Sequence, residues 1–453
     1  MWERKHLIRA DQIENNAEIW RYKTDETKKW ERVYKATAED NIAGFRYMVV
    51  HASKNSTPAL YAASFAFGEN PNGVTILKTT DGSNWTKVGG YLEGGSSRAM
   101  VSFNGKLYVS TIDAGGLIGG EKSYLYVSED PEFFDFELVL DYDSSQYIEG
   151  KNPVGGIDNM AVFNNKLYLG VGSSEGLEVW RSNDNKPRLN EWTRVIDKGF
   201  GEGLNKNSLA MGVYKDHLYI TSVKTNILLL AMPLGFGAEV VRIDKNDKWE
   251  LVVGGRPIEK TDPVTGIRTD SISGYGSGFS NPWNIYVWQI REFKNMLFAT
   301  TFDHGSDIEV LRDIALKNKD VLVKQFGELL YNLIVKLYDI ILELFKKIEY
   351  PRGFDMYMSN DGVNFKPISL DGLGNGNNYG GRILMVSSNN ELYVGTANPY
   401  EGCEVLKCDN IDAKNLDGNA ERNMFGAKDE MVQIFGEIET KYNEIIDYFI
   451  KNN

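Results

Sequence analysis

The chain has 453 residues, 42% of them apolar, which is enough material for a large hydrophobic core. Its 63 Asp and Glu residues outnumber 50 Lys and Arg residues, and the net charge of −13 argues against nucleic acid as a partner, because nucleic-acid binding needs basic surface that displaces counterions. The N-terminal stretch MWERKHLIRADQIENN has no apolar signal segment, which favours a cytoplasmic location.

The two cysteines, Cys403 and Cys408, lie five residues apart on one predicted strand. Side chains at an odd separation on a strand face opposite sides of the sheet. Neither a disulfide nor a shared metal ion is therefore expected, and both residues are predicted to be free thiols.

The stretch from Gly155 to Val195 reads as four short strands and recurs along the chain. Its runs NMAVF, KLYLGVG, LEVWRS and EWTRV are rich in β-branched and aromatic residues and are separated by turn residues. A repeat of this length is typical of a propeller, whose blades are four-stranded sheets.

The repeats can be followed in chain order. Residues 17–33 match only the third and fourth strands of the repeat. Four full units follow, at 45–88, 97–140, 155–195 and 208–253. A fifth unit is interrupted, at 284–305 with 354–368, and a sixth supplies three strands, at 382–407. The pattern predicts an all-β, six-bladed β-propeller over residues 17–408, closed by the N-terminal strands. The two chain ends together carry one strand more than a shared blade needs, so an extra edge strand stays open as an alternative.

Two segments have a helical period. Residues 311–350 interrupt the fifth unit with an apolar stretch that has one narrow polar stripe, which predicts a helical insertion in blade five. Charges recur at every turn of this stretch and argue against a membrane span. Residues 427–451 have apolar residues at i, i+3 and i+4 and predict a C-terminal amphipathic helix. The two helices are expected to pack together, with membrane-surface contact or a homo-oligomer interface as the alternative.

Turns between third and fourth strands resemble the Asp box of sialidases and related propellers. The clearest are TTDGSNW (Thr79 to Trp85) and SNDGVNF (Ser359 to Phe365), which lack one residue of the family pattern between Asp and Gly. Hydroxyl and carboxylate side chains at these positions bond to turn amides, so a structural role is expected. Through GSGFSNPWN, TFD and TANPYEGCEV, residues 17–408 resemble a bacterial and archaeal six-bladed propeller group with degenerate Asp-box (BNR/sialidase-like) repeats. The resemblance implies that fold and brings no established activity with it.

A ligand site is expected where first strands begin and second strands end, because these ends share one face of a propeller. Polar residues at these positions are the ligand-binding candidates: Arg46, Arg98, Asp113, Asn159, Asn284, Arg382 and Asn398. The three arginines resemble the triad with which sialidases clamp a carboxylate, and guanidinium geometry suits carboxylate or phosphate. As an alternative, they pair with Asp113, Asp158 or Asp303 and line a polar channel.

Asp303 and His304 are the catalytic candidates, because a histidine in a polar central site can act as a general base. No local transition-metal motif is present, and no cofactor is expected; calcium is the one metal that the oxygen ligands Asp113, Asp303 and Asn398 suit. The leading prediction is a ligand-binding or interaction propeller with a polar axial site for an anionic or carbohydrate-like small molecule. The alternatives are a hydrolase or lyase at the same site, and a membrane-surface or assembly protein that uses the apolar helices.

Overall fold

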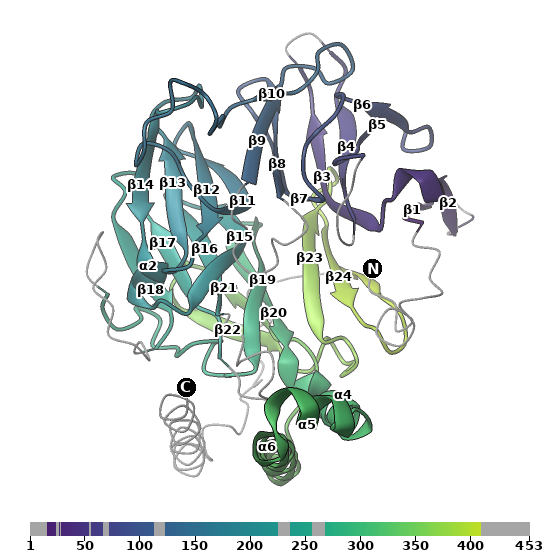
Figure 1. Ribbon diagram of the computed structural model, residues 1–453, viewed down its shortest axis with the longest axis vertical. Coiled ribbons are helices and arrows are strands. Elements are labelled where there is room, and N and C mark those ends of the chain that lie inside the picture. Colours follow the sequence, from purple (N-terminus) through teal and green to yellow (C-terminus); the bar gives the residue numbers. More distant parts are fainter. Residues whose placement is uncertain are drawn as a thin grey trace.

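Most strands belong to groups of consecutive antiparallel neighbours (Figure 1). The computed structural model describes residues 16–23, 27, 29–53, 56–66, 72–112, 123–224, 236–255 and 268–408. Within these residues there are five groups of four strands and one group of three: β3 (Gly44–His51), β4 (Ala59–Phe65), β5 (Ile76–Thr79) and β6 (Thr86–Val88); β7 (Ser96–Phe103), β8 (Lys106–Ile112), β9 (Ser123–Ser128) and β10 (Glu137–Leu138); β11 (Gly156–Phe163), β12 (Lys166–Gly172), β13 (Glu178–Ser182) and β14 (Trp192–Ile196); β15 (Asn205–Tyr214), β16 (His217–Lys224), β17 (Val240–Ile243) and β18 (Trp249–Val253); β19 (Asn284–Phe293), β20 (Met296–Asp303), β21 (Met356–Ser359) and β22 (Phe365–Ser369); β23 (Gly380–Val386), β24 (Leu392–Ala397) and β25 (Val405–Cys408).

Short turns set the register inside each group. Between β11 and β12, Asn164 and Asn165 both have positive φ, of 47° and 55°. A two-residue turn of this kind has the twist of antiparallel strands and is best made by Asn and Gly. The turns at Asp81 and Asp361 follow the expected local role, since each carboxylate accepts hydrogen bonds from the amides two and three residues later at 2.7–2.8 Å.

Apolar side chains fill the space between neighbouring groups. One hydrophobic cluster joins Phe103 and Tyr108 of the β7–β10 group to Met160 and Trp180 of the β11–β14 group. Similar clusters join each other consecutive pair, from β3–β6 through β23–β25. The protein is therefore mainly β, and its curled antiparallel sheets pack face to face in a propeller-like arrangement.

The junction between the first and last groups, called the seam below, is packed differently. Each first strand packs closely on the next, from β3 through β7, β11, β15 and β19 to β23. Among the described strands, no comparable packing joins β23 back to β3. Both strands carry exposed apolar side chains, including Met48, Val50, Ile383 and Met385.

The N-terminal hairpin of β1 (Glu18–Tyr22) and β2 (Trp30–Lys35) forms a separate two-stranded sheet. Its apolar face packs through Ile19 and Tyr34 onto Ala62 and Leu77 of the β3–β6 group. Within the described residues it pairs with no strand of the β23–β25 group, so the expected closure by strand pairing is not found there. The physical reason is that side-chain burial against β4 and β5, rather than a shared hydrogen-bond ladder, seats the hairpin.

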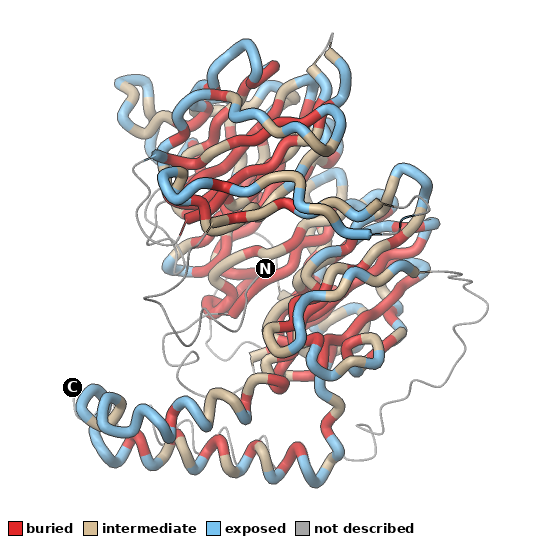
Figure 2. Tube along the Cα trace, turned by 90° about the vertical axis from the view of Figure 1, so that its right-hand side faces the viewer, coloured by how far each residue is buried: buried red, intermediate tan, exposed pale blue. Residues whose placement is uncertain are grey.

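Three α-helices lie between β20 and β21: α4 (Ile308–Lys317), α5 (Lys319–Phe326) and α6 (Glu328–Lys347). Gly327, with φ of 81°, separates α5 from α6, so one long helix is replaced by shorter ones. Figure 2 shows buried and exposed residues alternating along α6, and its buried side packs against Trp283 and Tyr350 below the sheets.

None of the described helices is long and apolar enough to cross a membrane. The expected C-terminal helix at 427–451 lies outside the described residues. The other helical elements of the described residues are very short: η1 (Ala38–Asp40), α2 (Lys198–Gly201) and η2 (His304–Asp307).

Candidate ligand-binding site

Backbone irregularities place four charged side chains at the same level of their first strands. In β3, β7, β11 and β23, the pairing with the second strand skips one residue near the strand start: Arg46, Arg98, Asp158 and Arg382. A β-bulge leaves its extra residue unpaired and turns that side chain away from the regular sheet face. The three arginines singled out in the sequence therefore occupy equivalent positions in three groups.

The charges of these residues act on one another. Burial, and then repulsion from Arg98 and Arg382, lowers the pKa of Arg46 to about 9. Burial also raises the pKa of Asp158 to about 6, against the opposing effect of Arg98 and a 2.7 Å hydrogen bond from Asn207. Such mutual effects require short separations in a poorly solvated space. The three arginines and Asp158 therefore lie close enough for their charges to affect one another.

Two of the arginines rest on aromatic rings. The guanidinium carbon of Arg46 lies 4.5 Å from the centre of the Phe65 ring, and that of Arg382 lies 4.6 Å from the Trp288 ring. Within the described residues neither arginine forms an ion pair, and the buried Nε of Arg46 has no hydrogen-bond partner there. A ring face attracts a cation without using its N–H donors, so these donors stay available.

Two glycines hold the aromatic rings in place. A Cβ on Gly44 would lie 2.5 Å from the Phe65 ring, and one on Gly380 would lie 2.2 Å from the Trp288 ring. Neither approach leaves room for a methyl group. Each arginine is therefore positioned by a ring, and each ring by a glycine.

A cavity of about 230 Å3 opens at the seam beside these arginines. It is called the seam pocket here, and its walls come from both sides of the junction: Phe45, Arg46, Phe65, Trp288, Tyr379, Arg382, Ile383, Gly395, Thr396, Ala397, Asn398, Cys403, Glu404 and Val405. Burial raises the pKa of Tyr379 to about 12, so this phenol stays neutral and leaves the local charge unchanged. The pocket combines cationic donors with a mainly apolar wall.

The structure does not group the other predicted ligand-binding residues with the arginines. Asn284 is fully buried and donates to Gly278 O and Asp355, and Asn398 donates to Asn378 while accepting from two backbone amides. Asn159 donates to Leu209 O and lines a second cavity of about 550 Å3 along the first strands. Asp113 lies outside the described residues.

Asp303 fastens both ends of the helical segment to the sheet. Its carboxylate accepts hydrogen bonds from Gly305 N and Ser306 Oγ before the helices, and from Tyr350 Oη and Gly353 N after them. The side chain is fully buried. These contacts occupy both oxygens, which gives Asp303 a structural role.

His304 faces a different carboxylate. Its Nδ1 lies 3.9 Å from Asp307 Oδ2, and its ring stacks on Phe302 with centres 6.3 Å apart. Burial lowers the pKa of His304 to about 4 and raises that of Asp307 to about 6. The histidine is therefore neutral near pH 7 and a weak base.

A repeated asparagine was missed as a structural signal. The loops GFGEGLN, GFSNPWN and GLGNGNN each place an Asn six residues after a Gly: Asn205, Asn284 and Asn378. Each Asn Nδ2 donates to the Gly carbonyl at 2.9–3.0 Å and to the carboxylate that immediately precedes the third strand of its own group at 2.6–2.7 Å. We call these contacts asparagine bridges; they make the long loops structural, and the Gly-to-Asn spacing could have revealed them.

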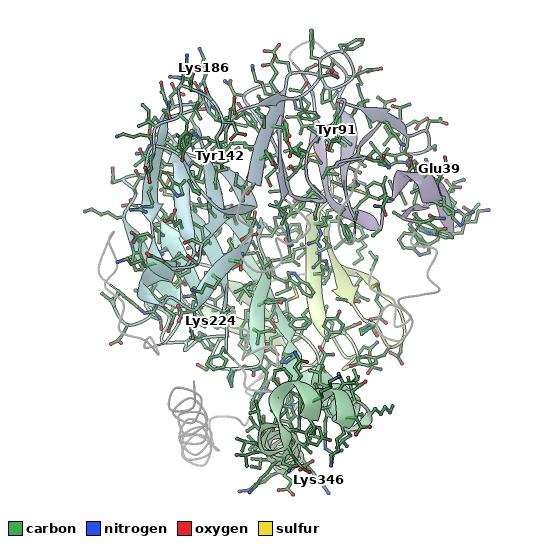
Figure 3. The ribbon with its side chains drawn as sticks, in the orientation of Figure 1. Glu39, Tyr91, Tyr142, Lys186, Lys224 and Lys346 are labelled. Atoms are coloured by element: carbon green, nitrogen blue, oxygen red, sulfur yellow. The ribbon has the colours of Figure 1, made fainter. Side chains whose placement is uncertain are left out.

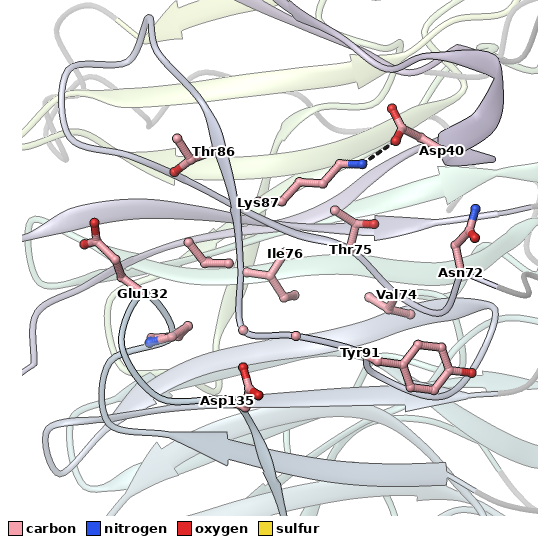
Figure 4. Close-up of a pocket in the computed structure, with 14 residues that line it drawn as sticks. Asp40, Asn72, Val74, Thr75, Ile76, Thr86, Lys87, Tyr91, Glu132 and Asp135 are labelled. Carbon is pink, nitrogen blue, oxygen red and sulfur yellow. Dashed lines mark hydrogen bonds and ion pairs between the residues drawn. The ribbon is translucent and has the colours of Figure 1, made fainter.

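Another cavity, of about 720 Å3, lies between the β3–β6 and β7–β10 groups (Figure 4). Its charged side chains are Asp40, Lys87, Glu132 and Asp135, and Lys87 is ion-paired with Asp40. None of the sequence-based candidates lines it. The described residues contain no group of three or more His, Cys, Asp or Glu that could hold a metal ion.

No protein-family model and no curated protein sequence matches the chain. Among solved structures it is similar to a putative 6-phosphogluconolactonase from Bacteroides fragilis NCTC 9343, with 9% identity, a TM-score of 0.43 and 86% of each chain covered. It is also similar to the α-L-arabinofuranosidase Arb93A from Fusarium graminearum (10% identity, TM-score 0.35, 64% of this chain and 82% of that one) and to Bacillus subtilis arabinanase Arb43A (14%, 0.30, 57% and 92%). Membership of the Asp-box group stays a prediction, and likenesses this low carry no argument about substrate.

Proposed function

We propose that this chain is a six-bladed β-propeller that binds a small anionic or carbohydrate-like molecule at its axis, through Arg46, Arg98 and Arg382. The blades are the six strand groups, with residues 311–350 as a helical insertion in the fifth and residues 427–451 as a C-terminal helix. This arrangement is supported by the consecutive antiparallel pairing and by the apolar clusters between successive groups.

One observation carries the binding proposal: Arg46 and Arg382 rest on aromatic rings and have no carboxylate partner in the described part of the chain. A cation away from water is costly unless an anion or hydrogen-bond acceptors compensate it. A bound carboxylate or phosphate supplies both, and bidentate guanidinium contacts are among the stronger hydrogen bonds in proteins.

Binding is better supported than hydrolase or lyase chemistry through Asp303 and His304. Both oxygens of Asp303 are used in holding the helical segment. His304, with a pKa of about 4, is poorly matched to proton transfer near pH 7. No observation on the described helices favours the membrane-surface or assembly alternative over axial binding.

The test is calorimetric titration of the full chain with acetate, phosphate and glucuronate. We expect at least one of these anions to bind, and Arg46→Met and Arg382→Met each to weaken its binding about 10- to 100-fold, as for loss of a charged hydrogen bond. Arg194→Met is the matched control, because Arg194 also stacks on a tryptophan, Trp180, but pairs with Glu178. A wild-type chain that binds no anion, or variants that bind as well as wild type, would overturn the proposal.

A further inference from the structure

The seam pocket has few free polar partners apart from its arginines. Asn398 is engaged by Asn378 and by the amides of Tyr400 and Glu401. Thr396 Oγ accepts from Glu404 N at 2.9 Å, and the Glu404 carboxylate accepts from Asn378 at 2.6 Å.

A ligand rich in hydroxyl groups would leave many of them unpaired in this pocket. Each unpaired polar group away from water lowers the binding affinity. The wall is instead made of apolar and aromatic side chains: Phe45, Phe65, Trp288, Tyr379, Ile383 and Val405. The lining therefore disfavours a sugar and suits a ligand with an apolar body.

Charge and size narrow the ligand further. The charged side chains that line the seam pocket are two arginines, Arg46 and Arg382, and one carboxylate, Glu404, which leaves one positive charge for the ligand to neutralise. The cavity of about 230 Å3 is smaller than the roughly 300–1,000 Å3 of pockets for drug-sized molecules, so a single ring fills it. Flat rings also pack favourably on aromatic walls, in stacked or edge-to-face contact.

We infer that the seam pocket takes an aromatic monoanion, a single aryl ring that carries one carboxylate or sulfonate group. The inference rests on the proposed function and narrows its ligand class. The anionic group lies at Arg46 and Arg382, and the ring lies among Phe45, Phe65 and Tyr379.

The first test is a ligand series on the wild-type chain, so that no variant has to fold. Benzoate, cyclohexanecarboxylate, acetate and glucuronate are titrated by calorimetry. We expect benzoate to bind at least about tenfold more tightly than acetate, a difference of about 1.4 kcal/mol, and glucuronate to bind no more tightly than acetate.

The outcomes separate the two proposals. If glucuronate or acetate binds as tightly as benzoate, the aromatic inference is overturned and anion binding stands. If cyclohexanecarboxylate matches benzoate, an apolar body suffices and the preference for a flat ring is wrong. If none of the four binds, both proposals fail.

The second test places the ligand in the pocket. Cys403 is exposed and lines the seam pocket, and Cys408 is the only other cysteine of the chain. In a Cys408→Ser variant, benzoate at ten times its Kd should slow alkylation of Cys403 by iodoacetamide about tenfold, since about nine in ten molecules are then occupied. An unchanged alkylation rate while calorimetry shows bound benzoate would place the ligand elsewhere and overturn the inference.

Discussion

The protein gathers cations inside its sheets in two places and compensates them in different ways. Around Glu239, which is fully buried, Lys224 (labelled in Figure 3) and Arg268 contact the carboxylate at 3.2 and 2.7 Å. At the seam, Arg46 and Arg382 instead lie over aromatic rings.

The difference separates a structural ion cluster from a binding site. Burial alone would raise the pKa of Glu239, but Lys224 and Arg268 hold it at about 2, so its charge is matched within the protein. The ring-supported arginines keep their N–H donors for a partner from outside. The type of partner, rather than the presence of a cation, indicates which cluster binds a ligand.

The largest expected effect is the loss of the carboxylate at the structural cluster. Glu239→Gln leaves Lys224 and Arg268 inside the protein without an anion. Breaking a buried pair in this way costs about 3–5 kcal/mol, so we expect the free energy of unfolding in a urea titration to fall by that amount.

The matched control for that variant is Glu178→Gln. Glu178 is the first residue of the third strand β13, close to the position that Glu239 holds just before β17. Its partner Arg194 is solvent-exposed, however, and the pair should contribute less than about 1 kcal/mol. Equal losses in the two variants would contradict the distinction between the clusters.

At the seam we expect a substitution of an arginine to weaken ligand binding and to leave the free energy of unfolding almost unchanged. Arg382→Met removes a cation that has no carboxylate partner in the described chain and retains an apolar stem against Trp288. The free energy of unfolding should fall by no more than about 1 kcal/mol, while benzoate affinity falls about 10- to 100-fold. A loss of stability as large as that of Glu239→Gln would indicate that Arg382 is structural.

Anion affinity should rise as the pH falls through 6. The pKa of Asp158 is raised to about 6, above its usual 3.8, so the folded protein takes up this proton more readily than the unfolded chain, and acidification from pH 8 to 5 favours the folded state. Protonation removes a negative charge beside Arg46 and Arg98, and affinity for benzenesulfonate, which stays ionised, should increase on the order of tenfold.

Asp158→Asn should bind benzenesulfonate at pH 8 as tightly as the wild type does at pH 5. Its affinity should then be independent of pH across this range. A pH dependence that survives in this variant would point to Asp307, whose pKa is also raised to about 6.

The smallest expected effect is that of Gly380→Ala. The added methyl group meets the Trp288 ring at 2.2 Å and displaces the ring that supports Arg382. Benzoate affinity should fall a few-fold, on the order of 1 kcal/mol for a disturbed cation–π contact. Gly276→Ala is the control, because Gly276 is not in the left-handed region and a Cβ there would lie no closer than 3.5 Å to a neighbouring atom; both positions are compared by calorimetry. Unchanged affinity in Gly380→Ala would show that the ring does not position the arginine.

The sequence predicts the strand groups well because strand alternation and turn residues are local signals. The four runs between Gly155 and Val195 match β11 to β14, and the Asn164-Asn165 turn is where the pattern places it. The positions of arginines at strand starts can also be predicted from the sequence. The bulges that turn Arg46 and Arg382 off the regular sheet face cannot be predicted in this way, because they depend on pairing with the next strand.

Contacts between strand groups are harder to predict from the sequence than the strands themselves. The residues that neighbour Phe65 and Trp288 in the sequence do not indicate that each ring contacts an arginine of a first strand. Asp303 was selected as a polar residue at a strand end, but two of its hydrogen bonds come from Tyr350 and Gly353, on the far side of the helices in sequence. Long-range partners of this kind decide whether a polar side chain is available to a ligand.

The asparagine bridges have a consequence for how the molecule opens. The main-chain carbonyls of the same three asparagines accept hydrogen bonds from the amides of Leu177, Ala238 and Phe354, each just before the third strand of the preceding group. In the described residues the β11–β14, β15–β18, β19–β22 and β23–β25 groups are thereby connected in series, whereas no such asparagine joins β3–β6 to β7–β10. Buried hydrogen bonds that tie neighbouring elements together make them unfold as one cooperative unit. Amide hydrogen exchange should therefore divide the protein into two parts, with slow, uniform exchange from β11 to β25 and earlier exchange in β3 to β10.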